Sequence, residues 1–161
     1  MKSLMVILYM FFGSLAVELP TIRAYFVLAK DSQSITEKLY NELAAYSQND
    51  PVVLAYKGAS QILKARLLKD RSAKKALVVQ GIQLLERSVE AAPEEVEIRL
   101  VRLAIQEHAP KILKYNGHMA EDKRMILANF ATQPTVVRTI ISQYAAQSKY
   151  FTAGEQAKLA E

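Results

Sequence analysis

Apolar residues recur at spacings of three and four along most of this chain, with charged residues between them. That spacing places apolar side chains on one face of an α-helix, and no long stretch alternates apolar and polar residues as a half-buried strand does. The sequence therefore predicts an all-α protein. Its predicted helices span about residues 21–30, 34–47, 51–69, 73–91, 94–108, 111–115, 120–131, 135–148 and 153–160.

Polar residues and prolines mark the predicted helix ends. Asp50 before Pro51 is typical of an N-cap followed by proline in the first turn. Residues 34–37 and 152–155 have the spacing of capping boxes, in which a hydroxyl and a carboxylate each accept a hydrogen bond from a free backbone N–H. Pro93 with the two glutamates after it predicts a third start, because negative charge is favourable at the positive end of the helix dipole. Two further breaks are predicted at Pro110 and Pro134.

Two of these helices carry clear apolar stripes, and each should pack one face into a core. Connections between the predicted helices are short, so helices adjacent in sequence should be antiparallel neighbours within one domain, residues 17–161. The stripes consist of Val52, Ala55, Tyr56, Ala59 and Leu63 in the third helix, and of Val136, Val137, Ile140, Ile141 and Tyr144 in the helix over 135–148.

The first sixteen residues have the layout of a secretory signal peptide. Lys2 precedes an uncharged apolar run over residues 4–12, and small residues follow up to Ala16, after which cleavage is predicted. The run is shorter than the roughly 20 apolar residues that span a bilayer, which favours a cleaved signal over an uncleaved inner-membrane anchor or a buried first helix. We therefore expect export across the inner membrane of a Gram-negative bacterium, into the periplasm.

One helical-repeat signature is visible. Gly81, Leu85, Ser88 and Pro93 have a spacing that resembles the second helix of a tetratricopeptide repeat, and Gly58 resembles the glycine at which the first helix of that repeat approaches the second. Gly58 stands about eleven residues too early for a standard unit of about 34 residues. A single unit cannot bury its own apolar face, so the flanking helices must complete the core.

A longer set of residues resembles a family of small exported proteins from Bacteroidetes with tetratricopeptide-like helices. This resemblance implies export and a helical fold, and it brings no assigned chemistry. The residues that carry it are Tyr56, Lys57, Gly58, Ala59, Pro93, Glu97, Ile98, Arg99, Arg102, Tyr115, Glu121, Asp122 and Lys123.

Composition then limits the chemistry that the chain offers. There is no cysteine, so thiolate catalysis and Cys-ligated metals are excluded, and only two histidines and five glycines are present. His108 and His118 lie near acidic residues in the sequence, but they lack the i, i+4 spacing of a helical metal site. No nucleophile elbow or Walker-type loop is found. We predict no enzyme, no cofactor and no metal, with a hydrolase whose site is assembled only in space as an alternative.

Arg99 and Arg102 are the first candidate site. They share a helix face beside apolar residues, and two buried guanidinium groups require acceptors for their hydrogen bonds. Glu95, one helix turn before Arg99, could accept from one arginine, and Asp122 or Glu121 from the other, which predicts a structural ion-pair network. In the alternative, Arg99, Arg102, Tyr115 and Lys123 line a groove that binds an acidic peptide terminus.

A cluster of cations between the third and fourth predicted helices is the second candidate site. It contains one acid, Asp70, and few aromatic residues, which argues against nucleic acid as a partner. A solvated hairpin tip is one interpretation, and contact with an acidic protein, a polysaccharide or an anionic membrane surface is the other. The cluster consists of Lys64, Arg66, Lys69, Arg71, Lys74 and Lys75.

The net charge of +5 is too small to indicate a nucleic-acid-binding protein. We expect a non-catalytic exported scaffold or adaptor that binds another protein or an acidic peptide in the bacterial cell envelope. The alternative is a peripheral membrane protein or an anion-binding protein that uses the cation cluster or the arginine face.

Overall fold

The computed structural model describes residues 18–160, and these form eight α-helices with no β-strand among them, packed as one compact domain. The prediction of an all-α fold is confirmed. The predicted signal peptide lies outside the described residues. The helices are α1 Leu19–Ala29, α2 Gln33–Ala44, α3 Pro51–Ala65, α4 Arg71–Ala91, α5 Val96–His108, α6 Met119–Asn129, α7 Thr135–Gln147 and α8 Ala153–Leu159, with single 3-10 turns η1 Lys111–Leu113 and η2 Phe130–Thr132.

None of the helices described in residues 18–160 combines the length and the apolar character that crossing a bilayer requires.

Two of the predicted helix caps are confirmed. The Asp50 carboxylate accepts a hydrogen bond from the Val53 N–H at 3.0 Å, with Pro51 as the first residue of α3. Thr152 and Glu155 form a complete capping box at the start of α8. These caps depend only on neighbouring residues, so the local sequence is sufficient to predict them.

The capping box predicted at residues 34–37 is wrong. Helix α2 begins at Gln33, and the hydroxyl of Ser32 caps it by accepting from the Ile35 N–H at 3.3 Å. The Thr36 hydroxyl donates instead to the Ala29 carbonyl oxygen at 2.7 Å, which joins the start of α2 to the last residue of α1. A contact to the preceding helix has therefore fixed the position of this turn.

Three other predicted boundaries move for local reasons. Helix α3 ends at Ala65 instead of residue 69, and α4 begins at Arg71 because Asp70 caps it by accepting from the Ala73 N–H at 2.7 Å. Helix α5 begins two residues later than predicted, with Glu95 as its N-cap. The segment predicted as a helix over 111–115 is the 3-10 turn η1.

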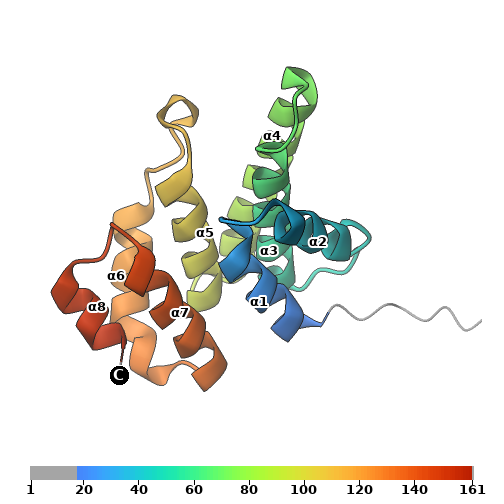
Figure 1. Ribbon diagram of the computed structural model, residues 1–161. Coiled ribbons are helices and arrows are strands. Elements are labelled where there is room, and N and C mark those ends of the chain that lie inside the picture. The colour runs from blue at the N-terminus through green and yellow to red at the C-terminus, as the bar shows by residue number, and fades with distance from the viewer. Residues whose placement is uncertain (1–17, 161) are drawn as a thin grey trace, which may run out of the picture.

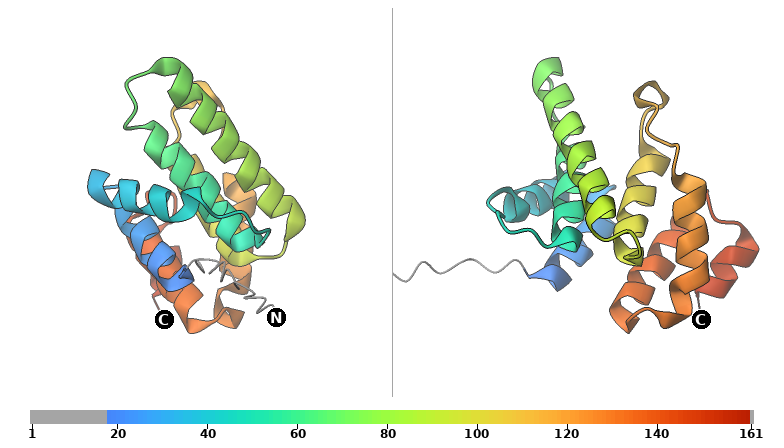
Figure 2. Two further views of the ribbon diagram at one scale, coloured as in Figure 1. Left: turned by 90° about the vertical axis from the view of Figure 1, so that its right-hand side faces the viewer. Right: turned by 180° about the vertical axis from the view of Figure 1, so that it is seen from behind.

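Helix α5 occupies the centre of the molecule, with α1 to α4 on one side and α6 to α8 on the other (Figures 1 and 2). One face of α5, with Ile98 and Val101, joins the core formed by α1 to α4. Another face, with Leu100 and Leu103, joins the core formed by α6 to α8. Because α5 contributes to both apolar cores, nearly every residue from Val96 to Gln106 is buried.

Helices α3 and α4 form a long antiparallel hairpin whose closed end projects from the rest of the domain (Figure 1). Gly58 and Gly81 face each other where the two helices cross. A Cβ atom added at Gly81 would lie 2.5 Å from the Gly58 carbonyl oxygen, and one at Gly58 would lie 2.6 Å from the Gly81 oxygen. The close approach predicted at Gly58 is therefore present, and it depends on hydrogen at both positions.

The stripe predicted in α3 is buried at Ala55, Tyr56, Ala59 and Leu63. In α7 the prediction is wrong at one position, because Val136 is 44% exposed while Val137 and Ile141 are buried. Successive residues of a helix point about 100° apart, and Val136 falls just outside the buried side of the stripe while Val137 falls inside it.

We expect Gly81→Ala to lower the free energy of unfolding by about 1–3 kcal/mol, because its Cβ overlaps backbone that can move only if the helices separate. Gly154→Ala is the matched control: nothing lies within 4 Å of its added Cβ, so it should leave stability unchanged or raise it by up to about 1 kcal/mol. Urea unfolding measures both. Equal stabilities for the two variants would contradict the close helix crossing.

Candidate functional site

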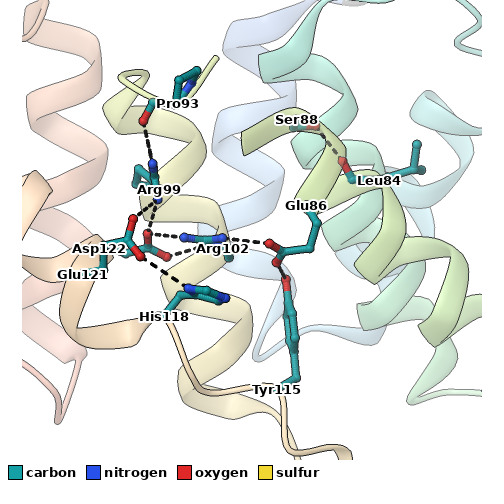
Figure 3. Close-up of polar contacts among 10 residues, drawn as sticks. All are labelled: Leu84, Glu86, Ser88, Pro93, Arg99, Arg102, Tyr115, His118, Glu121 and Asp122. Carbon is teal, nitrogen blue, oxygen red and sulfur yellow. Dashed lines mark hydrogen bonds and ion pairs between the residues drawn. The ribbon is translucent and has the colours of Figure 1, made fainter. Parts of the chain in front are cut away.

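Arg99 and Arg102 extend from α5 toward one buried carboxylate, that of Asp122 on α6 (Figure 3). Arg102 donates from Nε to Asp122 Oδ2 at 2.8 Å and from Nη2 to Oδ1 at 2.7 Å, a two-bond pairing of guanidinium and carboxylate. Arg99 donates from Nη1 to the same Oδ1 at 3.1 Å. The predicted ion-pair network is thus present, with Asp122 at its centre.

Every guanidinium nitrogen of both arginines donates to at least one acceptor within the chain. Arg99 donates to Glu121 Oε1 at 2.9 Å, and its Nε and Nη2 donate to the Pro93 carbonyl oxygen at 3.0 and 2.7 Å. Arg102 donates from Nη1 to Glu86 Oε2 on α4 at 2.8 Å. Glu86 in turn accepts a hydrogen bond from the Tyr115 hydroxyl (Figure 3). The network therefore connects α4, α5, α6 and the segment between α5 and α6.

Burial makes this network costly to disrupt. Asp122 is 0% exposed and Arg102 is 2% exposed. Burial opposes the charge of Arg102, but the hydrogen bond and charge of Asp122, followed by those of Glu86, raise the pKa of Arg102 above its usual value. Burial, followed by the contact with Glu86, raises the pKa of the Tyr115 hydroxyl well above its usual value. Arg102 thus stays cationic and Tyr115 stays a neutral donor.

Two sequence predictions about this region are wrong. Glu95 does not accept from Arg99, because its carboxylate caps α5 by accepting from the Glu97 N–H at 3.2 Å. Lys123 lies away from the arginines and donates to Glu155 Oε2 at 3.0 Å, although it follows Asp122 directly in the sequence. Of the predicted groove, only Tyr115 joins the arginines.

A second buried network, which the sequence analysis missed, centres on Glu97. Its two oxygens accept from Arg23 on α1 at 2.7 Å each, and Oε1 also accepts from the Tyr56 hydroxyl on α3 at 2.8 Å. The contact with Glu97 raises the pKa of Arg23, and burial followed by Glu97 raises that of Tyr56. The sequence does place Glu97 between the apolar residues Val96 and Ile98, which indicates a buried acid that needs partners. Those partners lie 74 and 41 residues away in the sequence, so the local pattern cannot identify them.

Glu107 attaches the other end of α5 to α7 and to the residues after it. Its carboxylate accepts from the hydroxyls of Tyr144 and Ser148 and, at 2.9 Å, from the Lys149 N–H. Burial by itself would raise the pKa of Glu107, but these three hydrogen bonds outweigh it and lower the pKa. Each buried or half-buried charge of α5 described so far is therefore used to hold neighbouring helices.

The cation cluster has a different environment. Lys64 is paired with Glu37 and lies over the Tyr40 ring. The other five cations are exposed at the closed end of the α3–α4 hairpin, and none has an ion-pair partner within residues 18–160. Asp70 is the one acid between them, and its carboxylate accepts from a backbone N–H of α4. These five are Arg66, Lys69, Arg71, Lys74 and Lys75.

A second projecting segment lies at the same end of the molecule as the tip of the hairpin (Figures 1 and 2). It contains η1, in which Ile112 is 88% exposed between the exposed Lys111 and the partly exposed Leu113. Lys114 follows in the left-handed conformation with a φ of 48°. We call the five hairpin cations together with Lys111 and Lys114 the basic end.

The two histidines are not brought together by shared ligands. His108 Nδ1 lies 3.0 Å from the Ala104 carbonyl oxygen, and His118 Nδ1 lies 3.3 Å from Glu121 Oε2. The contact with His118, and then that with Arg99, lowers the pKa of Glu121. Among residues 18–160, no group of three or more side chains of the metal-binding types is arranged to hold an ion.

Comparisons with protein-family models, with curated proteins and with solved structures find no match to this chain. The resemblance to exported Bacteroidetes proteins therefore stays a prediction.

We expect Arg102→Met to lower the free energy of unfolding by about 3–5 kcal/mol, because it leaves the buried Asp122 without its main partner. The double variant Arg102→Met, Asp122→Leu should recover part of this loss, since it removes the unpaired charge. Arg124→Met, at an exposed position on α6, is the control. Thermal and urea unfolding measure all three. A fold as stable as the parent's in Arg102→Met would contradict a structural role.

Proposed function

We propose that this protein is a non-catalytic helical scaffold of the bacterial cell envelope, exported by residues 1–16, which binds an acidic protein through its basic end. The observation that carries the proposal is the contrast between its cations. Arg99, Arg102 and Arg23 are neutralised by carboxylates of the chain, whereas the five exposed hairpin cations are not. Cations without internal partners raise the local positive potential and attract acidic surfaces.

The hairpin is suited to present these charges at fixed positions. Its two helices meet at Gly58 and Gly81 with backbone against backbone, so the tip is carried on two closely packed helices rather than on a flexible linker. The turn between the helices is short, from Arg66 to Asp70. A partner with matching carboxylates would therefore bind without first ordering the tip, which lowers the entropic cost of association.

Reversing charge at the tip tests this proposal. In Lys69→Glu, Lys74→Glu, Lys75→Glu, we expect capture of the partner from an envelope extract to fall by about tenfold or more. The matched control is Arg124→Glu, Lys149→Glu, Lys158→Glu, which makes the same change in net charge at exposed positions of α6, of the segment after α7 and of α8. Quantitative mass spectrometry of proteins cross-linked to each variant measures the effect.

A protein retained by the parent and by the control but lost from the tip variant, and released by salt, would support the proposal. If all three forms retain the same proteins, the basic end does not bind a protein partner.

A second candidate function, binding at an anionic membrane surface, is favoured by the η1 segment. Ile112, at 88% exposure, and Leu113, at 39%, lie between two lysines at the same end of the molecule as the hairpin tip. Aliphatic side chains that enter the interfacial region, flanked by lysines that contact anionic head groups, are typical of peripheral membrane binding. On this hypothesis both projecting segments touch one bilayer.

Vesicle sedimentation tests the second candidate. The test vesicles contain anionic lipid at about one head group in three. We expect the parent chain to bind them at low salt and to be released as the salt concentration rises. Ile112→Ser should weaken binding by about thirtyfold, because burial of this side chain contributes about 2 kcal/mol. Val136→Ser, at a valine that is 44% exposed on α7, is the control. No binding at low salt would remove this candidate.

A further inference from the structure

An apolar groove lies between α1, α3, α5 and α7, where the two cores meet. Its walls include Phe26, Leu63, Leu100, Ile105 and Ile140, which come from all four helices. The groove holds a cavity of about 60 Å³ that is partly open to solvent. That space admits the end of an alkyl chain, and the remainder of such a chain would lie along the open side.

Two tyrosines line the groove, and both have their hydroxyls bound elsewhere. The Tyr56 hydroxyl donates to Glu97 and the Tyr144 hydroxyl donates to Glu107. Both carboxylates accept further hydrogen bonds. Glu97 accepts from Arg23, and Glu107 accepts from Ser148 and from the Lys149 N–H. The two tyrosine hydroxyls are therefore unavailable to a ligand, and the interior of the groove has little capacity to hydrogen-bond a polar one.

The lining of the groove contains basic residues and no acidic one. Lys30, Arg66 and His108 line it, and no Asp or Glu is among its lining residues. Lys30 donates to Gln147 Oε1 at 2.9 Å and lies 3.7 Å from Asp31, a neighbouring acid outside the lining. Arg66 is exposed, and its guanidinium has no hydrogen-bond or ion-pair partner within residues 18–160. The rim therefore provides a free guanidinium beside an apolar interior.

We infer that this groove binds a small amphipathic carboxylate, with its alkyl tail among the apolar walls and its carboxylate at Arg66. Neither part of the inference rests on the proposed function of the basic end. A guanidinium pairs with a carboxylate through two parallel hydrogen bonds, and the apolar walls reward removal of a tail from water. The apolar N-terminal residues 1–16 are a poorer occupant, because they contain Lys2 and no acid to complement the rim.

Decanoate is the probe, added to the full chain with its isoleucine and alanine methyl groups labelled for NMR. We expect saturable shifts at the methyl groups of Ala104, Ile105 and Ile140, which line the groove, and none at the buried Ile126, which does not. Decyltrimethylammonium, which has the same tail and the opposite charge, should bind at least about fivefold more weakly. Acetate, which lacks the tail, should not bind.

Two variants test the two halves of the site. Arg66→Gln should weaken decanoate binding about fivefold, as expected for loss of one exposed ion pair, whereas Arg71→Gln should not change it. Ala104→Phe should abolish binding by filling the groove, with retention of the fold checked by its melting temperature and by the unchanged Ile126 signal.

Three outcomes would overturn the inference. The first is the absence of shifts at the groove methyl groups in millimolar decanoate. This includes the case in which those signals change with protein concentration instead, because a second copy of the chain occupies the groove. The second is equal binding of the carboxylate and the ammonium compound. The third is unchanged decanoate binding both in Arg66→Gln and in a correctly folded Ala104→Phe.

Discussion

The structure depends on neutralising the charges of a helix that is buried on nearly every side. Glu97, Arg99 and Arg102 lie in the middle of α5 with exposed fractions of 2%, 5% and 2%. A charge removed from water costs several kcal/mol unless a partner and hydrogen bonds replace the solvent. Each of these side chains meets that requirement with groups from other helices, so α5 is stable in its central position only when those helices are in place.

This requirement fixes how the two halves of the domain are arranged. Arg23 and Tyr56 reach Glu97 from α1 and α3, while Asp122 reaches both arginines from α6 and Glu86 reaches Arg102 from α4. The apolar cores on either side of α5 supply most of the driving force for packing, but apolar contacts tolerate sliding. Paired charges with defined hydrogen-bond geometry do not, and they select one register of the helices.

Charges on the surface, unlike those of α5, need no partner within the chain. At the closed end of the α3–α4 hairpin the cations point into solvent, where they lose no hydration and need no internal partner. Arg66 stands where this region meets the apolar groove. Arginine therefore stabilises the fold in the interior, at Arg99 and Arg102, and remains available for binding at the rim of the groove, at Arg66.

The sequence by itself determined the helical fold and several of the helix ends. Apolar spacing predicted the helical segments, and Asp50 and residues 152–155 acted as predicted because a cap involves only residues within one turn. The network at Arg99 and Arg102 was also predictable, since two arginines beside buried leucines must have acceptors. Asp122 and Glu121 were expected as acceptors from the sequence. Tertiary structure decided that Glu86 serves in place of Glu95, because packing of α4 brings a distant carboxylate closer to Arg102 than the local one. It also decided where α2 begins, where Lys123 binds, and that a groove exists between α1, α3, α5 and α7. Contacts between residues far apart in the chain have no periodic signature, and only the folded arrangement of helices brings them together.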